Sequence, residues 1–219
     1  IMSDYLVELR ESARQVIGGA AIPACEDKTW PLISELGWLL ASVPEELDGL
    51  GLGIQGACVL HSELGRGLSQ APFLPAVMTL DAVCESELAE KASWVGRFTT
   101  GDFVTAPLAE SELNLERLDT GKATFTGLVS AVQSADKASH ALTWTGDAAC
   151  VALISLEQPG VEIIERPTWD ITRRLFDLHL TKVALDEQLV LARGSVAQHL
   201  ITRIQTLRDF AIAADSLGG

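Results

Sequence analysis

The sequence predicts an α+β fold in three consecutive parts: an N-terminal helical bundle domain, a middle antiparallel β-barrel or sandwich domain, and the start of a C-terminal helical domain. Apolar residues recur at helical spacing over roughly the first 95 residues. After Gly101, short runs rich in Val, Thr, Ile and Leu alternate with turn residues, as in an all-β module. Helical spacing returns from Ser195. We therefore place the three domains at residues 1–100, 101–190 and 191–219.

The first part is expected to contain five helices. The first two are marked by apolar residues at helical spacing: Leu6, Leu9, Ala13 and Val16, then Leu32, Leu36 and Leu39. The third is expected over 54–65, with His61 on its apolar side, and two more over 75–83 and 87–95. For His61, a packed core position is favoured over an acid–base role.

The middle part shows the two-residue period of strands. Phe176, Leu178 and Leu180 alternate with polar neighbours, which is typical of a half-buried strand, so His179 is expected to face solvent. Arg173 and Arg174, just before this strand, are interpreted as a surface turn with local carboxylate partners, in preference to a grip on a phosphate. Several such strands with turns between them favour an antiparallel barrel or sandwich.

The last part is one long helix with a single apolar stripe: Val196, Leu200, Ile204, Leu207, Ala211 and Ala214. Such a stripe needs a partner, and no segment follows it in the chain. We expect that the sequence is cut short here, or that the stripe docks on another chain.

Charge and cysteine content exclude several classes of function. The net charge of −14 and pI of about 4.6 disfavour phosphate backbones and anionic lipid surfaces, so neither nucleic acid nor membrane is an expected partner. The four cysteines are widely spaced without a C-x-x-C pair, and are interpreted as reduced thiols of a cytoplasmic protein. The sequence has no secretory signal and no metal-ligand spacing.

Residues 44–60, PEELDGLGLGIQGACVL, contain a literal G-x-G-x-x-G at Gly51, Gly53 and Gly56. A dinucleotide-binding loop requires a strand that leads directly into the first glycine. Here Pro44 and two glutamates intervene, and the chain lacks alternating strands and helices. We interpret the glycines as a turn between two helices.

The same region resembles the N-terminal helical domain of the acyl-CoA dehydrogenase family. The matching residues are Leu36-Gly37-Trp38, Pro44-Glu45-Glu46, Gly49-Leu50-Gly51-Leu52-Gly53 and Glu63-Leu64-Gly65-Arg66-Gly67. The stretch TWDITRRLFDLHLTKVAL resembles the end of that family's β-domain, and AIAADSLGG resembles the opening of its C-terminal domain. These motifs and stretches occur in the family's order, and together they cover nearly the whole chain.

This resemblance implies an FAD-dependent oxidation of an acyl-CoA thioester to a trans-2-enoyl-CoA. In the family, a carboxylate removes the α-proton, the β-hydrogen leaves as hydride to the flavin, and an electron-transfer flavoprotein takes the electrons. Hydrogen bonds must polarise the thioester carbonyl for the α-proton to be acidic enough. The family's base lies in the C-terminal domain, so we assign no catalytic residue in this chain.

Two family motifs that contact the flavin are eroded in this sequence. Where the family has T-E-P-x-A-G-S-D, Glu110 agrees but Ala109 and Leu115 replace a Thr and a Ser. Where it has W-I-T/S, the aromatic and the hydroxyl are absent, although Gln133 and nearby backbone N–H groups can still donate to a flavin edge. The residues implied for cofactor binding are Leu108, Ala109, Glu110, Ala131, Val132 and Gln133.

The erosion is similar to that of paired, unlike subunits in which one partner has lost part of its site, as in the dehydrogenases of steroid side-chain breakdown. The resemblance implies a second acyl-CoA dehydrogenase subunit as partner, or a homo-oligomer. Two alternatives remain open: a non-catalytic partner that completes another subunit's flavin site, and an oxidase or monooxygenase on the same fold.

Overall fold

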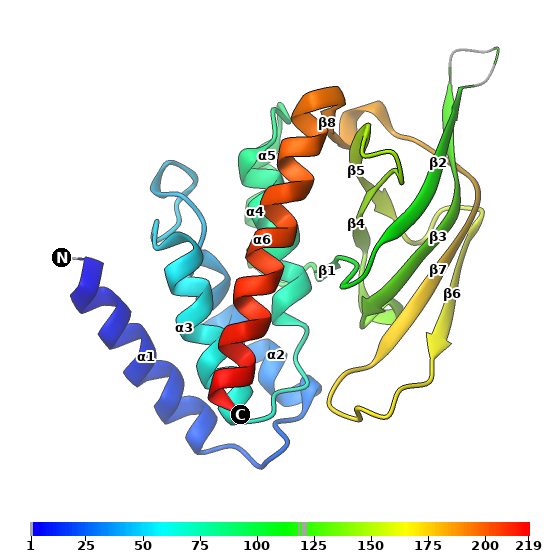
Figure 1. Cartoon of the computed structure of the whole chain (residues 1–219). Helices are drawn as coiled ribbons and strands as arrows, with labels where there is room; N and C mark the ends of the chain where they lie inside the picture. Colours follow the sequence, from blue (N-terminus) through cyan, green and yellow to red (C-terminus); the bar gives the residue numbers. More distant parts are fainter. Residues whose placement is uncertain (1, 118, 120–121) are drawn as a thin grey trace.

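The computed structural model describes residues 2–117, 119 and 122–219, and it follows the predicted order of helices, then strands, then one helix (Figure 1). In the described part, the helices before the first strand are α1 (Met2–Gly18), α2 (Glu26–Glu35), α3 (Gly53–Arg66), α4 (Phe73–Glu85) and α5 (Lys91–Thr99). The final helix, α6, covers Gly194–Gly218. The predicted α+β class is confirmed.

The strands form two four-stranded sheets. The inner sheet has the order β1-β4-β5-β8, with bounds β1 (Val104–Thr105), β4 (His140–Trp144), β5 (Cys150–Ser155) and β8 (Val190–Arg193). The outer sheet has the order β2-β3-β7-β6, with bounds β2 (Ser111–Arg117), β3 (Ala123–Gln133), β7 (Leu175–Ala184) and β6 (Val161–Arg166). All neighbouring strands pair antiparallel except β1 and β4, which are parallel. This short parallel pair departs from the all-antiparallel prediction.

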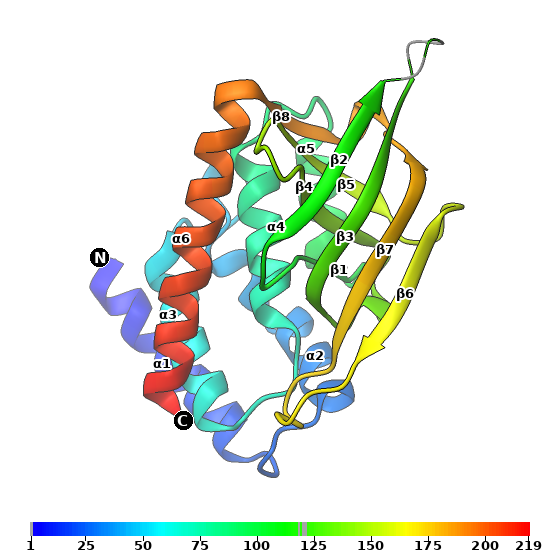
Figure 2. The same ribbon diagram turned by 45° about the vertical axis from the view of Figure 1, so that its right-hand side comes forward.

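The inner sheet is buried on both faces. Leu142 and Trp144 of β4 pack into the core shared with the helices, whereas Ala141 of the same strand packs into the core between the two sheets. The same alternation continues on β5, where Leu153 faces the helices and Ile154 faces the outer sheet. A strand covered on both faces must be apolar throughout, which explains the continuous run CVALI. The molecule therefore has three layers: helices, inner sheet and outer sheet (Figure 2).

The expected alternation of β7 is confirmed, whereas two helix predictions are wrong at their ends. In β7, Phe176, Leu178 and Leu180 are buried. Helix α2 ends at Glu35 because Gly37 adopts a left-handed φ of 67°, so Leu36 is 45% exposed and does not extend the apolar face.

Helix α5 begins at Lys91, four positions later than its expected start at residue 87. The Ser86 hydroxyl accepts a hydrogen bond from the Leu88 backbone N–H at 3.3 Å. This local side-chain bond stabilises a turn that competes with helix, a type of contact that apolar periodicity does not reveal.

Helix α6 finds its partner inside the chain, which corrects the expectation that its apolar stripe needs another chain. The helix runs back alongside α3 and α4 (Figure 1) and also contacts β5 and β8. Leu200, Ile204, Leu207 and Ala211 are buried there, although Val196 stays 59% exposed. The sequence pattern identified the stripe, but its partner precedes it in the chain by more than a hundred residues.

The glycine-rich stretch is a turn that leads into α3, as predicted. It follows two short 3-10 turns, Trp38–Ala41 and Glu45–Leu47, and no strand feeds it. The Gly51 N–H donates to the Val43 carbonyl and the Leu52 N–H to the Ala41 carbonyl, each at 2.9 Å. Because these N–H groups are used within the turn, they cannot cradle a phosphate.

None of the helices in the described part of the chain is both long and apolar enough to cross a membrane.

Candidate functional site

The two segments implied for cofactor binding meet at one edge of the β-structure. The first follows β1 and the second closes β3. The Leu108 N–H donates to the Ala131 carbonyl at 3.0 Å, and Pro107 forms an isolated antiparallel bridge with Val132. A bulge in β3 between Val129 and Val132 places Ala131 at a φ of 55°. Segments more than twenty residues apart in sequence thus form one surface.

Exposure divides the six predicted residues into two groups. Leu108, Ala109 and Ala131 are half-buried and Glu110 is exposed, so all four can contact an added group. Val132 and Gln133 have 0% of their surface exposed. A residue that is enclosed by its own chain cannot touch a cofactor unless its surroundings move.

The backbone groups at this edge already have partners. The Ala131 N–H donates to the Asp177 carboxylate at 3.0 Å, and that carboxylate also pairs with Arg166 at 3.1 Å. From α6, the Arg208 guanidinium donates to the Leu108 carbonyl at 3.4 Å. The Ala131 N–H, expected to be available to a flavin edge, is therefore engaged by a side chain in this structure.

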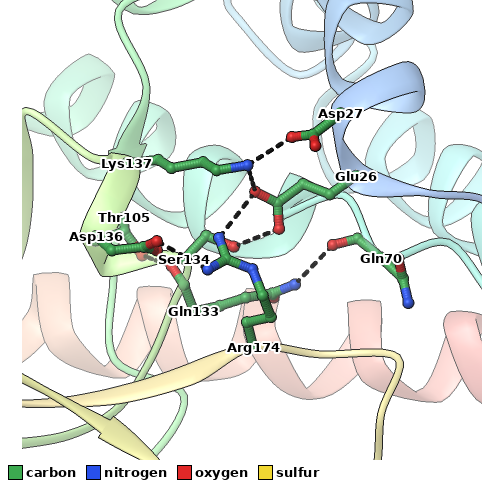
Figure 3. A network of polar contacts seen from close by, with 9 residues as sticks. All are labelled: Glu26, Asp27, Gln70, Thr105, Gln133, Ser134, Asp136, Lys137 and Arg174. Atoms are coloured by element: carbon green, nitrogen blue, oxygen red, sulfur yellow. Dashed lines mark hydrogen bonds and ion pairs between the residues drawn. The ribbon is translucent and has the colours of Figure 1, made fainter.

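Directly behind this edge, a polar network joins the helices to the β-structure (Figure 3). The Glu26 carboxylate, at the start of α2, accepts hydrogen bonds from the Ser134 hydroxyl at 2.8 Å and from Arg174 at 3.2 Å, and pairs with Lys137 at 3.1 Å. Lys137 also reaches Asp27 at 2.6 Å. The Glu26 side chain is only 10% exposed, and so it is nearly enclosed by cationic and hydroxyl groups of the β-structure.

Further contacts extend this network through Arg174 and Gln133. Arg174 also pairs with Asp136 at 2.8 Å, and the two carboxylates raise the pKa of its guanidinium against the opposing effect of burial. The Gln133 side-chain amide points across the junction and donates to the Gln70 carbonyl at 3.4 Å (Figure 3). The backbone carbonyl of Gln133 accepts from the Thr105 hydroxyl at 2.7 Å.

The cavities near these elements are lined by residues other than the six predicted ones. One of about 630 Å³ lies between α3, α4 and α6, and its lining includes Ile54, Asp81, His199 and Arg203. Another of about 280 Å³ lies beside the network, with Trp30 on its wall. Of the six predicted residues, those at 108–110 and 131 have exposed surface, whereas Val132 and Gln133 have none.

Among the described residues, no group of three or more His, Cys, Asp or Glu side chains is placed to hold a metal. The histidines are placed as interpreted from sequence: His61 is buried at 3% exposure and His179 is exposed. Arg173 pairs with the local carboxylate of Asp170 at 4.0 Å, as expected for a turn. The other partners, Asp215 of Arg173 and Glu26 and Asp136 of Arg174, lie far away in the sequence.

Sequence reasoning missed Glu26, Asp177 and Arg208. None of them lies in a recognisable motif, and Glu26 has the sequence context of an ordinary acidic residue in the first turn of a helix. The alternation of β7 placed Asp177 beside Phe176, but its contact with Ala131 depends on strand pairing and on the bulge.

The solved structures that this chain resembles identify its fold as that of the acyl-CoA dehydrogenases. Among solved structures, it is similar to the ChsE4-ChsE5 complex from Mycobacterium tuberculosis, with a TM-score of 0.83 and 21% identity over 97% of this chain and 62% of that one. It is also similar to a variant of the steroid ACAD Tcur3481-Tcur3483, with a TM-score of 0.84 and 23% identity over 100% and 64% of the two chains.

Glutaryl-coenzyme A dehydrogenase in complex with glutaryl-CoA has the same fold, with a TM-score of 0.81 and 16% identity over 98% of this chain and 63% of that one. The chain thus spans a little under two thirds of the length of these structures. No curated protein sequence matches it.

Residues 7–102 match the family model described as "Acyl-CoA dehydrogenase, N-terminal domain". This match and the shared fold confirm the resemblance to the acyl-CoA dehydrogenase family that was inferred from the sequence.

Proposed function

We propose that this chain is a subunit of an FAD-dependent acyl-CoA dehydrogenase that introduces an α,β double bond into an acyl-CoA thioester. It works beside a second, unlike subunit, and the catalytic base lies outside this chain. Steroid-type acyl-CoA is the proposed substrate class, and an electron-transfer flavoprotein is the proposed electron acceptor. We place the complex in the cytoplasm and keep the division into domains at 1–100, 101–190 and 191–219.

One observation carries this proposal. The Leu108 N–H donates to the Ala131 carbonyl, and the Arg208 guanidinium of α6 donates to the Leu108 carbonyl. The two segments implied for cofactor contact thus form one wall together with the last helix. The similarity to the ChsE4-ChsE5 complex and to the steroid ACAD supports a heteromeric, steroid-type assignment.

A second candidate is favoured by the burial of Val132 and Gln133 and by the engaged Ala131 N–H. On this alternative, the chain is a non-catalytic partner that completes or stabilises the flavin site of another subunit. Both candidates share the fold and the partner. They differ in whether this chain contributes flavin contacts of its own.

The test is expression of this chain alone and together with a second, unlike acyl-CoA dehydrogenase subunit. Flavin absorbance near 450 nm and dehydrogenation of steroid-type acyl-CoA are measured on each preparation. We expect flavin and activity in the co-purified complex, with electrons passing to electron-transfer flavoprotein.

Flavin content and activity that stay the same in the partner subunit when this chain is omitted would contradict the proposal. Oxygen consumption by the complex without any added acceptor would indicate the oxidase or monooxygenase alternative.

A further inference from the structure

Helix α6 carries a second set of apolar side chains on the face that points away from the core. Val196, Phe210 and Leu217 are 59%, 57% and 86% exposed. Their positions differ by multiples of seven residues, a spacing that places side chains on one line along a helix. The other large apolar side chain that α6 exposes is Ile212. Three of these four side chains therefore share one line.

The residues between these positions complete a stripe with the period of a coiled coil. We call this stripe the outer seam: Val196, His199, Arg203, Thr206, Phe210, Ala213 and Leu217. All seven side chains are exposed. Leu200 and Ile204 mark the buried face of the same helix. Apolar residues on two sides of a helix are typical of one that is covered on both sides.

A cleft runs along the N-terminal half of the outer seam. The cavity of about 630 Å³ is lined by His199, Arg203 and Thr206 of the seam, by Ile54 of α3 and by Asp81 of α4. In Figure 1, α6 lies in front of α4, and no described element covers its near side. A groove between helices that is bordered by apolar side chains has the shape that an amphipathic helix fills.

The charge of the cleft favours one kind of helix. The Arg203 guanidinium donates to both oxygens of Asp81, at 2.7 and 2.8 Å, and lies 3.2 Å from a Glu85 oxygen. One cation thus faces two carboxylates, and the whole chain has a net charge of −14. A second copy of this chain would bring the same negative charge to the contact. A partner with Lys and Arg beside an apolar stripe is complementary to it.

We propose that the outer seam is the docking face for an amphipathic helix of the second, unlike subunit, with basic residues flanking the apolar stripe of that helix. Phe210 is the anchor of the contact, because a large aromatic side chain at the centre of an interface contributes most to binding. The inference rests on the proposed function, which supplies the unlike subunit. It goes beyond that proposal by naming the surface on which the subunit docks.

The experiment measures the association of this chain with the purified unlike subunit by analytical ultracentrifugation, for the wild type and for Phe210→Ala. We expect Phe210→Ala to raise the Kd by at least about tenfold, and Leu217→Ala to raise it as well. Ile212→Ala is the matched control, because Ile212 is exposed on the same helix but lies off the outer seam. It should leave the Kd unchanged. Thermal unfolding verifies that each variant is folded.

Equal Kd values for the wild type and Phe210→Ala overturn the inference, and so does the absence of any complex. Self-association of this chain that Phe210→Ala abolishes would assign the outer seam to a second copy and would also overturn it. A complex that forms through the seam but is inactive contradicts the proposed function and leaves this inference standing. An active complex that is insensitive to Phe210→Ala contradicts this inference alone.

Discussion

Buried polar groups in proteins normally have a hydrogen-bond partner, and a few residues of this chain depart from that rule. Among the described residues, three buried side-chain atoms lack one: His61 Nε2, Thr124 Oγ1 and Gln133 Oε1. His61 lies on α3 against the Phe73 ring, with ring centroids 4.9 Å apart, and its Nδ1 lies 2.7 Å from the Ala57 carbonyl. The sequence predicted this packed position from the apolar spacing around it.

From the buried position of His61 we predict that the folded protein loses stability as the pH falls. Burial lowers the pKa of its imidazole from 6.5 to about 4, against the raising effect of the Ala57 bond. As the pH falls below 6.5, the unfolded chain takes up this proton before the folded chain does. The contribution of neutral His61 is therefore complete above pH 6.5 and is lost as the pH falls to about 4, by on the order of 3 kcal/mol.

The measurement is the free energy of unfolding in urea at pH 7 and at pH 4.5, for wild type and His61→Leu. The wild type should lose more stability between these pH values than the variant, because leucine has no proton to bind. His199→Leu, at an exposed histidine on α6, is the matched control and should keep the wild-type difference. Equal pH dependence of the wild type and His61→Leu would refute the attribution of this loss of stability to His61.

At the scale of elements, the contact between α3 and α6 depends on glycine. A Cβ atom at Gly65 would overlap the backbone carbonyl of Asp215, and one at Gly218 would overlap that of Ser62. The two helices therefore approach backbone to backbone at their C-terminal turns. Packing this close leaves no room for a methyl group without moving a helix.

Gly65→Ala should destabilise the protein by about 2 kcal/mol or more, since α6 must shift to accept the new methyl group. Gly96→Ala is the matched control, because Gly96 is an exposed helical glycine in α5 with no atom near its added Cβ. Alanine there should stabilise by up to about 1 kcal/mol through helix propensity. Thermal and urea unfolding report both changes, and equal effects of the two substitutions would exclude the close-packing explanation.

The elements were predictable where their signal is local. Periodicity found each helix of the described chain and the alternation of β7, because burial of one face imposes a fixed spacing. It failed at the end of α2 and at the start of α5, where a left-handed Gly37 and a Ser86 side-chain bond set the boundary. It also left α6 without a partner, because periodicity shows which face is buried and not what covers it.

At the scale of the whole molecule, Glu26 ties the helical layer to the β-structure. Its carboxylate holds Ser134, Arg174 and Lys137, while Asp136 and Asp27 hold the outer ends of the two cations. The network therefore fixes the position of the corner that follows β3.

Glu26→Gln should lower the free energy of unfolding by about 1–2 kcal/mol, because Arg174 and Lys137 lose a nearly buried carboxylate but keep their second partners. Glu187→Gln removes the exposed pair with Arg193 and should change stability by less than about 0.5 kcal/mol. Urea unfolding of both variants gives the comparison. A loss at Glu26 no greater than at Glu187 would contradict the proposed role of the network.

The candidate site was predictable only as positions along the chain. Matching motifs named residues 108–110 and 131–133, and the structure brings these two segments together at one edge. Their exposure was not predictable, because it depends on the β3 bulge, on Asp177 of the neighbouring strand and on the junction that encloses Gln133. Each of these is a contact between residues far apart in the sequence.

The sequence by itself determined the order of helices and strands and the apolar faces. It also determined the resemblance of the first hundred residues to the N-terminal domain of the acyl-CoA dehydrogenase family. Each of these is encoded in local spacing or in short motifs. Only the tertiary structure decided that α6 is covered from within the chain, that Glu26 joins the layers and that Gln133 is enclosed. These features arise where distant segments meet, and the energy of such a contact belongs to the pair of surfaces and not to either stretch of sequence.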